Sequence, residues 1–539
     1  MLHLPLGAAS VAAATAAAVP DRAIIVSRHG VRRQFPSSAF NFSLYAPGKH
    51  FDTSDEAWGA GGEGMGVLTQ HGYAAVQRMG AYQSGRYASL LSAADGGCAD
   101  GAAFVYCEEN MPRDEKTAEA FFKGLGCALP PLHSEGVEYL IDQGSKPRGE
   151  NGQCALGTQA QVEGRVGGSV DGYLRLYKPL LAKLSELLGC CAKSLCPAGM
   201  ESCSLEDLPG SWDPAHWYTT FSGPIYAGKY FAEWIELTML NGMDFAWGKL
   251  SVEEVMEFSA FVTQYRAFEF DLLAARPFGS ALLSHIAASL TQWESGQREP
   301  ALAHDPSPRL VYYAAHDTNL LYLAELLGLK WLSHGYQPNH TPPGGALVFE
   351  AFGPANPANP LDEWQIALYF DIQTPLQIRE LTVLSDDDPA TTPSRVPVTI
   401  PGCSTKAEDD PHAPLLCPLS TFTRLVRQAV QPECITPPDL RAFAKGRTAT
   451  IFDTMPGAGY FTAGVFLAFV SVAVWVAAER RAARCHAAGR STETMRNALL
   501  PRREHTVTSW HAGGGVLVVV KEKGETVSLV SVPDHSRAV

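Results

Sequence analysis

The chain has 539 residues, of which 46% are hydrophobic and 18% are charged, and its formal net charge at pH 7 is -14. A chain of this composition is globular and long enough for more than one domain, which excludes wholesale disorder. The acidic balance, with no long stripe of lysine and arginine ahead of the C-terminal region, argues against a nucleic-acid partner.

The N-terminal twenty residues contain no Lys, Arg, Asp or Glu and are rich in alanine. An Ala-x-Ala pattern near Ala18 predicts a signal peptide over residues 1–20, and the alternative is a disordered alanine-rich leader, because a basic first region is missing. Twelve cysteines and the glycosylation sequons at Asn41 and Asn339 favour secretion, since disulfides persist in oxidising compartments.

The next segments alternate between strand and helix. An apolar run at 23–26 predicts a buried strand, which leads into the loop Arg28-His29-Gly30-Val31-Arg32. Helical spacing follows over 68–91, and a second short strand over 102–106 precedes Arg113 and another helical pattern that ends near Leu125. Recurrence of strand, loop and helix is typical of a wound α/β sheet.

The middle of the chain has a different character. Residues 170–188, 226–240 and 252–273 show helical spacing with few strand signals, so we expect an all-helical cap domain over 155–270. A helix over 277–293, a strand over 310–315 and a helix over 320–329 then return to the earlier pattern. A Pro-Pro-Gly-Gly turn at 342–345 separates them from two alternating segments, 346–352 and 364–371, which predict an antiparallel hairpin at the edge of the sheet. The predicted class is therefore α/β, with one domain built from residues 21–154 and 271–445.

The C-terminal region predicts a membrane anchor. Residues 460–478 are nineteen uncharged residues, which at about 1.5 Å each span roughly 29 Å, close to the thickness of a bilayer core. The alternative is a buried core helix, but aromatic residues near both ends and a following Glu-Arg-Arg favour a single transmembrane helix over 459–478. The positive-inside rule then makes residues 479–539 a cytoplasmic tail and the body lumenal or extracellular. Within the tail, 516–520 and 526–532 predict a small β-hairpin.

Two histidines, His29 and His316, each follow a predicted strand, where the ligand crevice of an open α/β sheet lies. Arginines suit a phosphate because the guanidinium stays charged and binds bidentately, so Arg28, Arg32 and Arg113 are candidate phosphate ligands, with His316 as a further donor. His29 would attack phosphorus and Asp317 would protonate the leaving alcohol. This scheme requires no metal and no cofactor. The alternative for the Arg-His-Gly loop alone is a solvated basic surface loop.

These motifs resemble the histidine acid phosphatase family, in particular its bacterial-type phytase and glucose-1-phosphatase branch. The similarity includes 28–32, Arg113 with 116–121, 201–205, 241–243, 316–319 and 341–350, and it spans roughly residues 22 to 440. It implies a phosphoglycerate-mutase-like three-layer α/β domain with a mixed sheet and a helical cap. It also implies His29 as nucleophile, Asp317 as proton donor, and Arg28, Arg32, Arg113 and His316 as phosphate ligands.

The resemblance also implies a set of disulfides and one further carboxylate. The pairs are Cys98 with Cys127, Cys154 with Cys434, Cys196 with Cys203, and Cys403 with Cys417, while Cys107, Cys190 and Cys191 have no assigned partner. Glu233 matches a family carboxylate that assists with substrate or water, and its alternative is an ordinary acid on a helix surface.

The chain departs from the family pattern directly after the arginine-histidine loop. The family usually continues Arg-x-Pro, whereas Arg32 is followed by Arg33 and Gln34, with proline only at position 36. A lysine that helps phytases hold inositol phosphates is replaced by the Ser37-Ser38-Ala39-Phe40 segment.

We therefore expect a membrane-anchored acid phosphatase acting on small phosphomonoesters, either phytate and other inositol phosphates or sugar phosphates, at the cell surface or in an endosomal or lysosomal membrane. The second hypothesis is a trafficking or receptor-like membrane protein on a phosphatase scaffold with little catalysis. It is motivated by the Pro36 spacing and by the predicted tail hairpin, a kind of element that pairs with partners.

Overall fold

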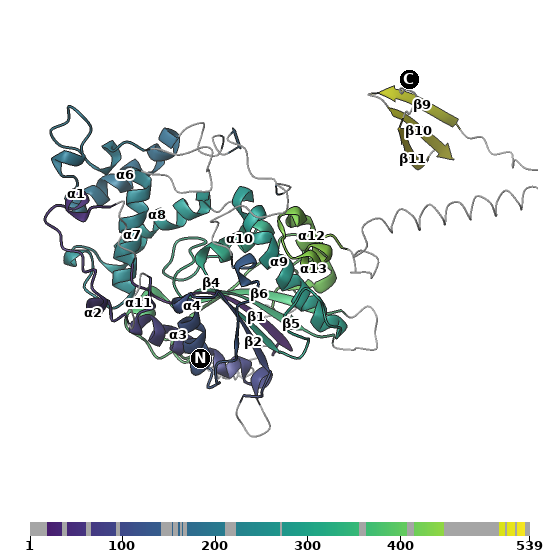
Figure 1. Cartoon of the computed structure of the whole chain (residues 1–539), viewed down its shortest axis with the longest axis horizontal. Coiled ribbons are helices and arrows are strands. Elements are labelled where there is room, and N and C mark those ends of the chain that lie inside the picture. Colours follow the sequence, from purple (N-terminus) through teal and green to yellow (C-terminus); the bar gives the residue numbers. More distant parts are fainter. Residues whose placement is uncertain are drawn as a thin grey trace, which may run out of the picture. The chain divides into compact units, whose positions relative to one another are not determined.

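The computed structural model describes residues 19–34, 40–60, 66–92, 98–141, 154, 160–161, 164, 170–210, 223–269, 272–354, 363–406, 414–446, 506–512, 515–522 and 525–533. It divides into two compact units, residues 1–449 and residues 450–539, which are described one at a time. Figure 1 labels their helices and strands.

The first unit is built on a mixed sheet whose strand order is β3-β2-β4-β1-β5-β6-β7, with β8 also pairing β6. Strands β1 to β4 are parallel, and β5 pairs antiparallel with β1 and with β6. The predicted antiparallel hairpin is confirmed as β5 and β6, but it does not form the edge of the sheet, because β7 and β8 both pair with β6. The strand bounds are β1 (Arg22–Arg28), β2 (Ala103–Cys107), β3 (Leu132–His133), β4 (Leu310–Ala315), β5 (Ala346–Phe352), β6 (Gln365–Ile372), β7 (Ser394–Pro397) and β8 (Leu416–Pro418).

Helices cover both faces of this sheet, because alternate residues of each central strand are apolar on opposite sides. Ala23 and Ile25 of β1 pack with residues of α3 (Gln70–Leu91) and α4 (Pro112–Gly124). Ile24 and Val26 pack instead with residues of α9 (Leu272–Ser295), α10 (Asp317–Leu327) and α12 (Leu419–Ala429), and α13 (Pro438–Ala444) packs on α9. The resulting three layers, visible around β1 and β4 in Figure 1, confirm the predicted α/β class.

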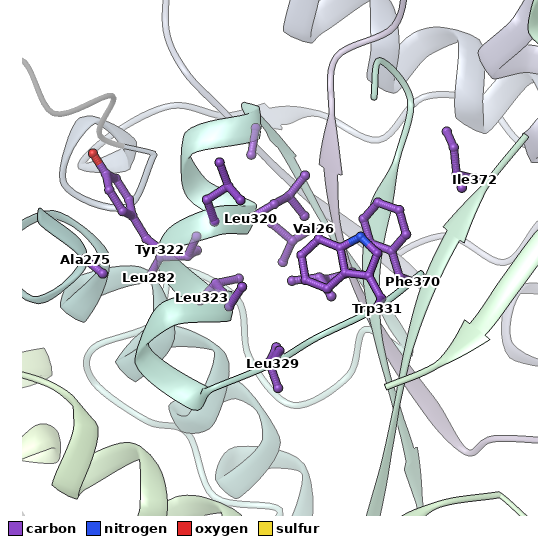
Figure 2. Packing of buried hydrophobic residues seen from close by; sticks show 14 of the residues in the cluster. Val26, Ala275, Leu282, Leu320, Tyr322, Leu323, Leu329, Trp331, Phe370 and Ile372 are labelled. Atoms are coloured by element: carbon purple, nitrogen blue, oxygen red, sulfur yellow. The ribbon is translucent and has the colours of Figure 1, made fainter. Parts of the chain in front are cut away.

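The larger core cluster joins the central strands to α10 and to the antiparallel edge. Figure 2 shows Val26 of β1 beside Leu320 and Leu323 of α10, with Trp331 lying over Phe370 of β6. The two aromatic rings are stacked, with centroids 4.6 Å apart and an interplanar angle of 14°. This packing anchors the start of α10, where the chain turns out of β4.

Three long helices, α6 (Val170–Leu188), α7 (Pro224–Leu240) and α8 (Val252–Glu269), pack on one another and form the helical part that the sequence predicts. The limits of the cap domain at 155 and 270 stay a prediction. The shorter helices are α1 (Phe42–Tyr45), α2 (Asp55–Trp58) and α11 (Pro375–Arg379), with 3-10 turns η1 (Val137–Tyr139), η3 (Lys193–Leu195), η4 (Leu205–Asp207), η6 (Ala246–Gly248) and η7 (Pro432–Cys434).

One helix begins earlier than predicted. The expected start at Pro277 follows from the usual place of proline in the first turn, but α9 begins at Leu272 and continues through that proline. Ala274 and Ala275, which precede it, are buried in the core. Packing of this extra turn outweighs the backbone hydrogen bond that a proline cannot donate.

The four disulfides implied by the family resemblance are present: Cys98–Cys127, Cys154–Cys434, Cys196–Cys203 and Cys403–Cys417. A fifth bond joins the adjacent residues Cys190 and Cys191, for which the sequence suggested no partner. Cys107 is free and buried. Of the two sequon asparagines, Asn41 is exposed and Asn339 is partly buried, and their glycosylation stays a prediction.

The second unit contains a three-stranded antiparallel sheet in the order β11-β10-β9. Strands β10 (Gly515–Glu522) and β11 (Glu525–Pro533) contain the two predicted hairpin segments, and β9 (Thr506–Ala512) adds a strand that the sequence analysis missed. The predicted transmembrane helix at 459–478 lies outside the described residues. Among the helices that are described, none combines the length and the apolar character that a bilayer crossing needs.

We predict that Gly72→Ala destabilises the first unit, because α3 meets the loop after β1 at this glycine. A Cβ atom on Gly72 would lie 2.2 Å from the carbonyl oxygen of Val31, and backbone cannot move aside cheaply. Overpacking of this kind costs about 1–3 kcal/mol. Differential scanning calorimetry should find a lower melting temperature than for the wild type.

The matched control is Gly85→Ala in the same helix, where an added Cβ meets no atom within 4 Å. Alanine is a better helix former than glycine, so this variant should be unchanged or more stable by about 0.5–1 kcal/mol. Equal effects of the two substitutions would contradict the close approach of α3 to Val31.

Candidate active site

The pairing of β1 with β4 brings the two predicted histidines together. In the parallel register Arg28 lies opposite Ala315, so His29 and His316 leave the sheet at the same edge. The His29 amide donates to the Ala315 carbonyl over 3.0 Å, and the imidazole rings lie edge to face with centroids 5.7 Å apart. Both side chains are buried.

The environment of His29 selects one tautomer and the neutral form. Its Nδ1 lies 2.9 Å from the carbonyl oxygen of Gly30, and a carbonyl only accepts, so Nδ1 carries the hydrogen and Nε2 keeps its lone pair. Burial, followed by the charges of Arg113, Arg28 and Arg32, holds the pKa of His29 well below its ordinary value of 6.5. The lowered pKa therefore favours a neutral ring with a free lone pair on Nε2 in weakly acidic solution.

Three buried arginines line the same pocket. Arg28 donates from Nη1 to the carbonyl of Thr341 over 2.5 Å, and its Nη2 lies 3.1 Å from Oδ2 of Asp317. Arg113, at the second position of α4, has Nη2 3.5 Å from Nδ1 of His316. Among the residues described, Nε of Arg28 and Nε of Arg113 have no hydrogen-bond acceptor. Buried donors without acceptors beside a neutral nucleophile form a site for an anion.

Glu233 of α7 supplies negative charge to this arginine cluster. Its Oε1 lies 3.3 Å from Arg32 and 3.7 Å from Arg28, while its Oε2 contacts Nζ of Lys229, one helical turn earlier, at 3.1 Å. Burial lowers the pKa of Arg32 to about 10, which still leaves it charged in neutral solution. Glu233 is only 4% exposed, so it is not an acid on an open helix surface, and its role in turnover stays a prediction.

His316 and Asp317 lie where β4 passes into α10. The backbone amide of His316 donates to Oδ1 of Asn319 over 3.0 Å, and Asp317 is the first residue of the helix. Oδ1 of Asp317 accepts from the amide of Thr318, while Oδ2 faces Arg28. The start of α10 therefore holds the carboxyl against the arginine cluster. All six residues predicted for phosphate chemistry are buried, and ring contacts, ion pairs or charge interactions join them into one cluster.

Four residues near these groups were not recognised as site residues from the sequence. Gln34 bridges Arg32 and Glu233, accepting from the former over 2.7 Å and donating to the latter over 3.3 Å. The sequence analysis noted Gln34 only as a departure from a family proline. Lys229 could have been found from its four-residue spacing to Glu233 on a helix. Glu108 and Asp114, which contact Nε2 of His316, carried no sequence signal beyond their closeness to Arg113.

Comparison with known proteins agrees with this geometry. The model of the histidine phosphatase superfamily (branch 2) matches residues 21–359. Phytase AppA of Escherichia coli (strain K12) is 28% identical over 430 residues, covering 77% of this chain and 93% of its own length. Glucose-1-phosphatase of Salmonella typhimurium is 23% identical over 421 residues, covering 76% and 92%.

Solved structures give the same result for the fold. The phytase of Citrobacter braakii superposes with a TM-score of 0.63 at 25% identity and covers 78% of this chain and 100% of its own. Hafnia alvei phytase in complex with tartrate gives a TM-score of 0.62 at 26% identity, covering 78% and 98%. The matched segment is more than half of the chain and contains all six pocket residues, and the protein therefore belongs to the histidine phosphatase superfamily, branch 2.

Proposed function

We propose that this protein hydrolyses phosphomonoesters through a covalent phosphohistidine on His29. The observation that carries the proposal is the neutral Nε2 of a buried histidine among three buried guanidinium groups. Such groups cancel the charge of a phosphate dianion and align it for in-line attack, which supplies much of the catalysis in phosphoryl transfer.

In the first step Nε2 of His29 forms a bond to phosphorus as the ester P–O bond breaks. The leaving alkoxide takes the proton of the Asp317 carboxyl, so a neutral alcohol departs. Arg28, Arg32 and Arg113 hold the nonbridging oxygens, and His316 donates a further hydrogen bond. The hydrogen bond from Nδ1 to the Gly30 carbonyl persists throughout and stabilises the positive charge that the phosphorylated ring acquires.

In the second step a water molecule attacks the phosphohistidine from the side that the alcohol has left. The Asp317 carboxylate accepts one proton of that water, the new P–O bond forms, and the N–P bond breaks. Inorganic phosphate and neutral His29 are the products, so the enzyme returns to its starting protonation state. Glu233, close to Arg28 and Arg32, assists with substrate or water in this proposal.

The proposed substrates are inositol phosphates and sugar phosphates, because the curated relatives are named as a phytase and a glucose-1-phosphatase. Lys229 favours the more highly phosphorylated class, since its side chain is 16% exposed beside the arginine cluster. Lys229 adds a positive charge beyond those of the arginines. It would take the place of the lysine that helps phytases hold inositol phosphates, which this chain lacks near position 38.

The proposed location is an oxidising and acidic compartment, with the catalytic unit lumenal or extracellular. Five disulfides within residues 98–434 support an oxidising environment. The low pKa of His29 supports activity in acid, because the nucleophile stays unprotonated there. Anchoring through 459–478 remains part of the proposal.

We predict that His29→Ala lowers kcat/KM for p-nitrophenyl phosphate, phytate and glucose 1-phosphate by at least about 10⁴-fold, as expected for loss of a covalent nucleophile. The matched control is His50→Ala, which removes an exposed histidine and should leave all three rates unchanged. Initial rates with the purified protein test this. Turnover by His29→Ala close to that of the wild type would exclude the proposed mechanism.

We also predict that kcat/KM falls on the acid side only well below pH 6.5. The pH dependence of kcat/KM reports ionisations of the free enzyme, including that of His29. The sign follows from the nucleophile: only neutral His29 attacks, and a lowered pKa keeps it neutral as the pH falls. With an ordinary pKa, only about 1% of His29 would be neutral two units lower, at pH 4.5. The measurement is a profile from pH 3.5 to 7.5.

The substrate phosphate also ionises in this pH range, and its effect on kcat/KM must be distinguished from that of His29. This is done by repeating the pH profile with aryl phosphates that differ in their second pKa. A limb that belongs to the substrate moves with the aryl group, whereas a limb that belongs to His29 does not. An invariant limb near pH 6.5 would contradict the lowered pKa of His29.

A further inference from the structure

A group of three potential metal ligands adjoins the proposed phosphate pocket. Glu108 follows β2, Asp114 lies in the first turn of α4, and His316 follows β4. One ligand atom from each lies within 4.8 Å of the other two. The histidine takes part through Nε2, whereas its Nδ1 faces Arg113. One ring nitrogen of His316 thus faces the two carboxylates, while the other faces Nη2 of Arg113.

Hydrogen bonds from the described residues leave Asp114 of this cluster unsatisfied. Nε2 of His316 can carry one hydrogen, yet it lies 3.2 Å from Oδ2 of Asp114 and 3.3 Å from Oε2 of Glu108. The contact with Glu108 has hydrogen-bond geometry, whereas no donor in the described part of the chain hydrogen-bonds to either oxygen of Asp114. Asp114 is 0% exposed, and Nε of Arg113 is 3.8 Å from its Oδ1.

A buried carboxylate in this state has a high free-energy cost. A metal ion coordinated by all three side chains would offset this cost better than the single hydrogen on Nε2. A metal ion binds several ligands at once, whereas that hydrogen is shared between two carboxylates.

We propose that Nε2 of His316 and the carboxylates of Asp114 and Glu108 bind a divalent cation of the zinc class. Zinc bonds to nitrogen and carboxylate oxygen of about 2.0–2.2 Å place neighbouring tetrahedral ligands about 3.3–3.6 Å apart. The separations of 3.2 and 3.3 Å from Nε2 to the two carboxylates are close to that range. Imidazole nitrogen selects against Mg²⁺ and Ca²⁺, which prefer oxygen ligands alone.

Three protein ligands leave one coordination position for water, as in other open zinc sites. Coordination at Nε2 would also determine the tautomer of His316, because the hydrogen must then reside on Nδ1. Nδ1 and Nη2 of Arg113, 3.5 Å apart, would both donate toward one phosphate oxygen. This consequence rests on the proposed phosphatase function, whereas the binding of the ion does not.

The test is isothermal titration of the purified full chain with ZnCl₂ at pH 7, after dialysis against EDTA. The wild type should bind one equivalent of zinc. Asp114→Asn should bind no such equivalent, or should bind it at least about tenfold more weakly than the wild type does. The control is Glu109→Gln, which removes the exposed carboxylate next to Glu108 and should leave that equivalent intact. Thermal melting with and without ZnCl₂ provides a second readout, since an ion that binds the folded state raises the melting temperature.

The proposal is overturned if the wild type binds no zinc in excess of Asp114→Asn, in which case the cluster holds a proton only. If Asp114→Asn fails to fold, Glu108→Gln gives the same comparison at a side chain that is 24% exposed. Turnover of p-nitrophenyl phosphate by the zinc-free wild type is measured alongside. Activity without zinc binding would contradict the metal site alone, and zinc binding without activity would contradict the phosphatase alone.

Discussion

The parallel register between β1 and β4 is the constraint on which the site depends. It sets Arg28 opposite Ala315, so that both histidines emerge at one edge of the sheet with their rings in edge-to-face contact. A shift of one residue would turn alternate side chains to the other face and separate them. The strands are apolar on both faces and covered by helices on each, which makes any other register costly.

The site at this edge places buried positive charges close together and partly offsets them with negative charge. Three guanidinium groups repel one another when buried, and Glu233 reduces that repulsion before a ligand arrives. Burial, and after it the charges of the same arginines, lowers the pKa of His29, so the groups proposed to bind phosphate would also keep the proposed nucleophile unprotonated. In the proposed mechanism, phosphate binding and activation of His29 are therefore two effects of one charge arrangement.

Much of this could be predicted from the sequence because its signals are local. Apolar runs of strand length located β1 and β4, and the residues directly after them located His29 and His316. Gln34 and Asp114 were missed because their importance comes from tertiary contacts, to Glu233 of α7 and to His316 after β4, which no periodicity reveals. Lys229 has a local signal, its four-residue spacing to Glu233, that was not used. The start of α9 was missed because packing of Ala274 and Ala275 overrides the local preference of Pro277. Strand β9 contains no apolar run, and pairing with β10 defines it.

The central claim is that phosphate passes through His29, and a rapid-quench experiment with a ³²P-labelled aryl phosphate tests it most directly. The account predicts an acid-labile, base-stable label that forms within the first turnover and maps by mass spectrometry to the peptide containing His29. Substitution of Asp317 by asparagine should change the lifetime of that label without moving it. Turnover with no protein-bound phosphate on the millisecond scale, or a label on another residue, would contradict the account.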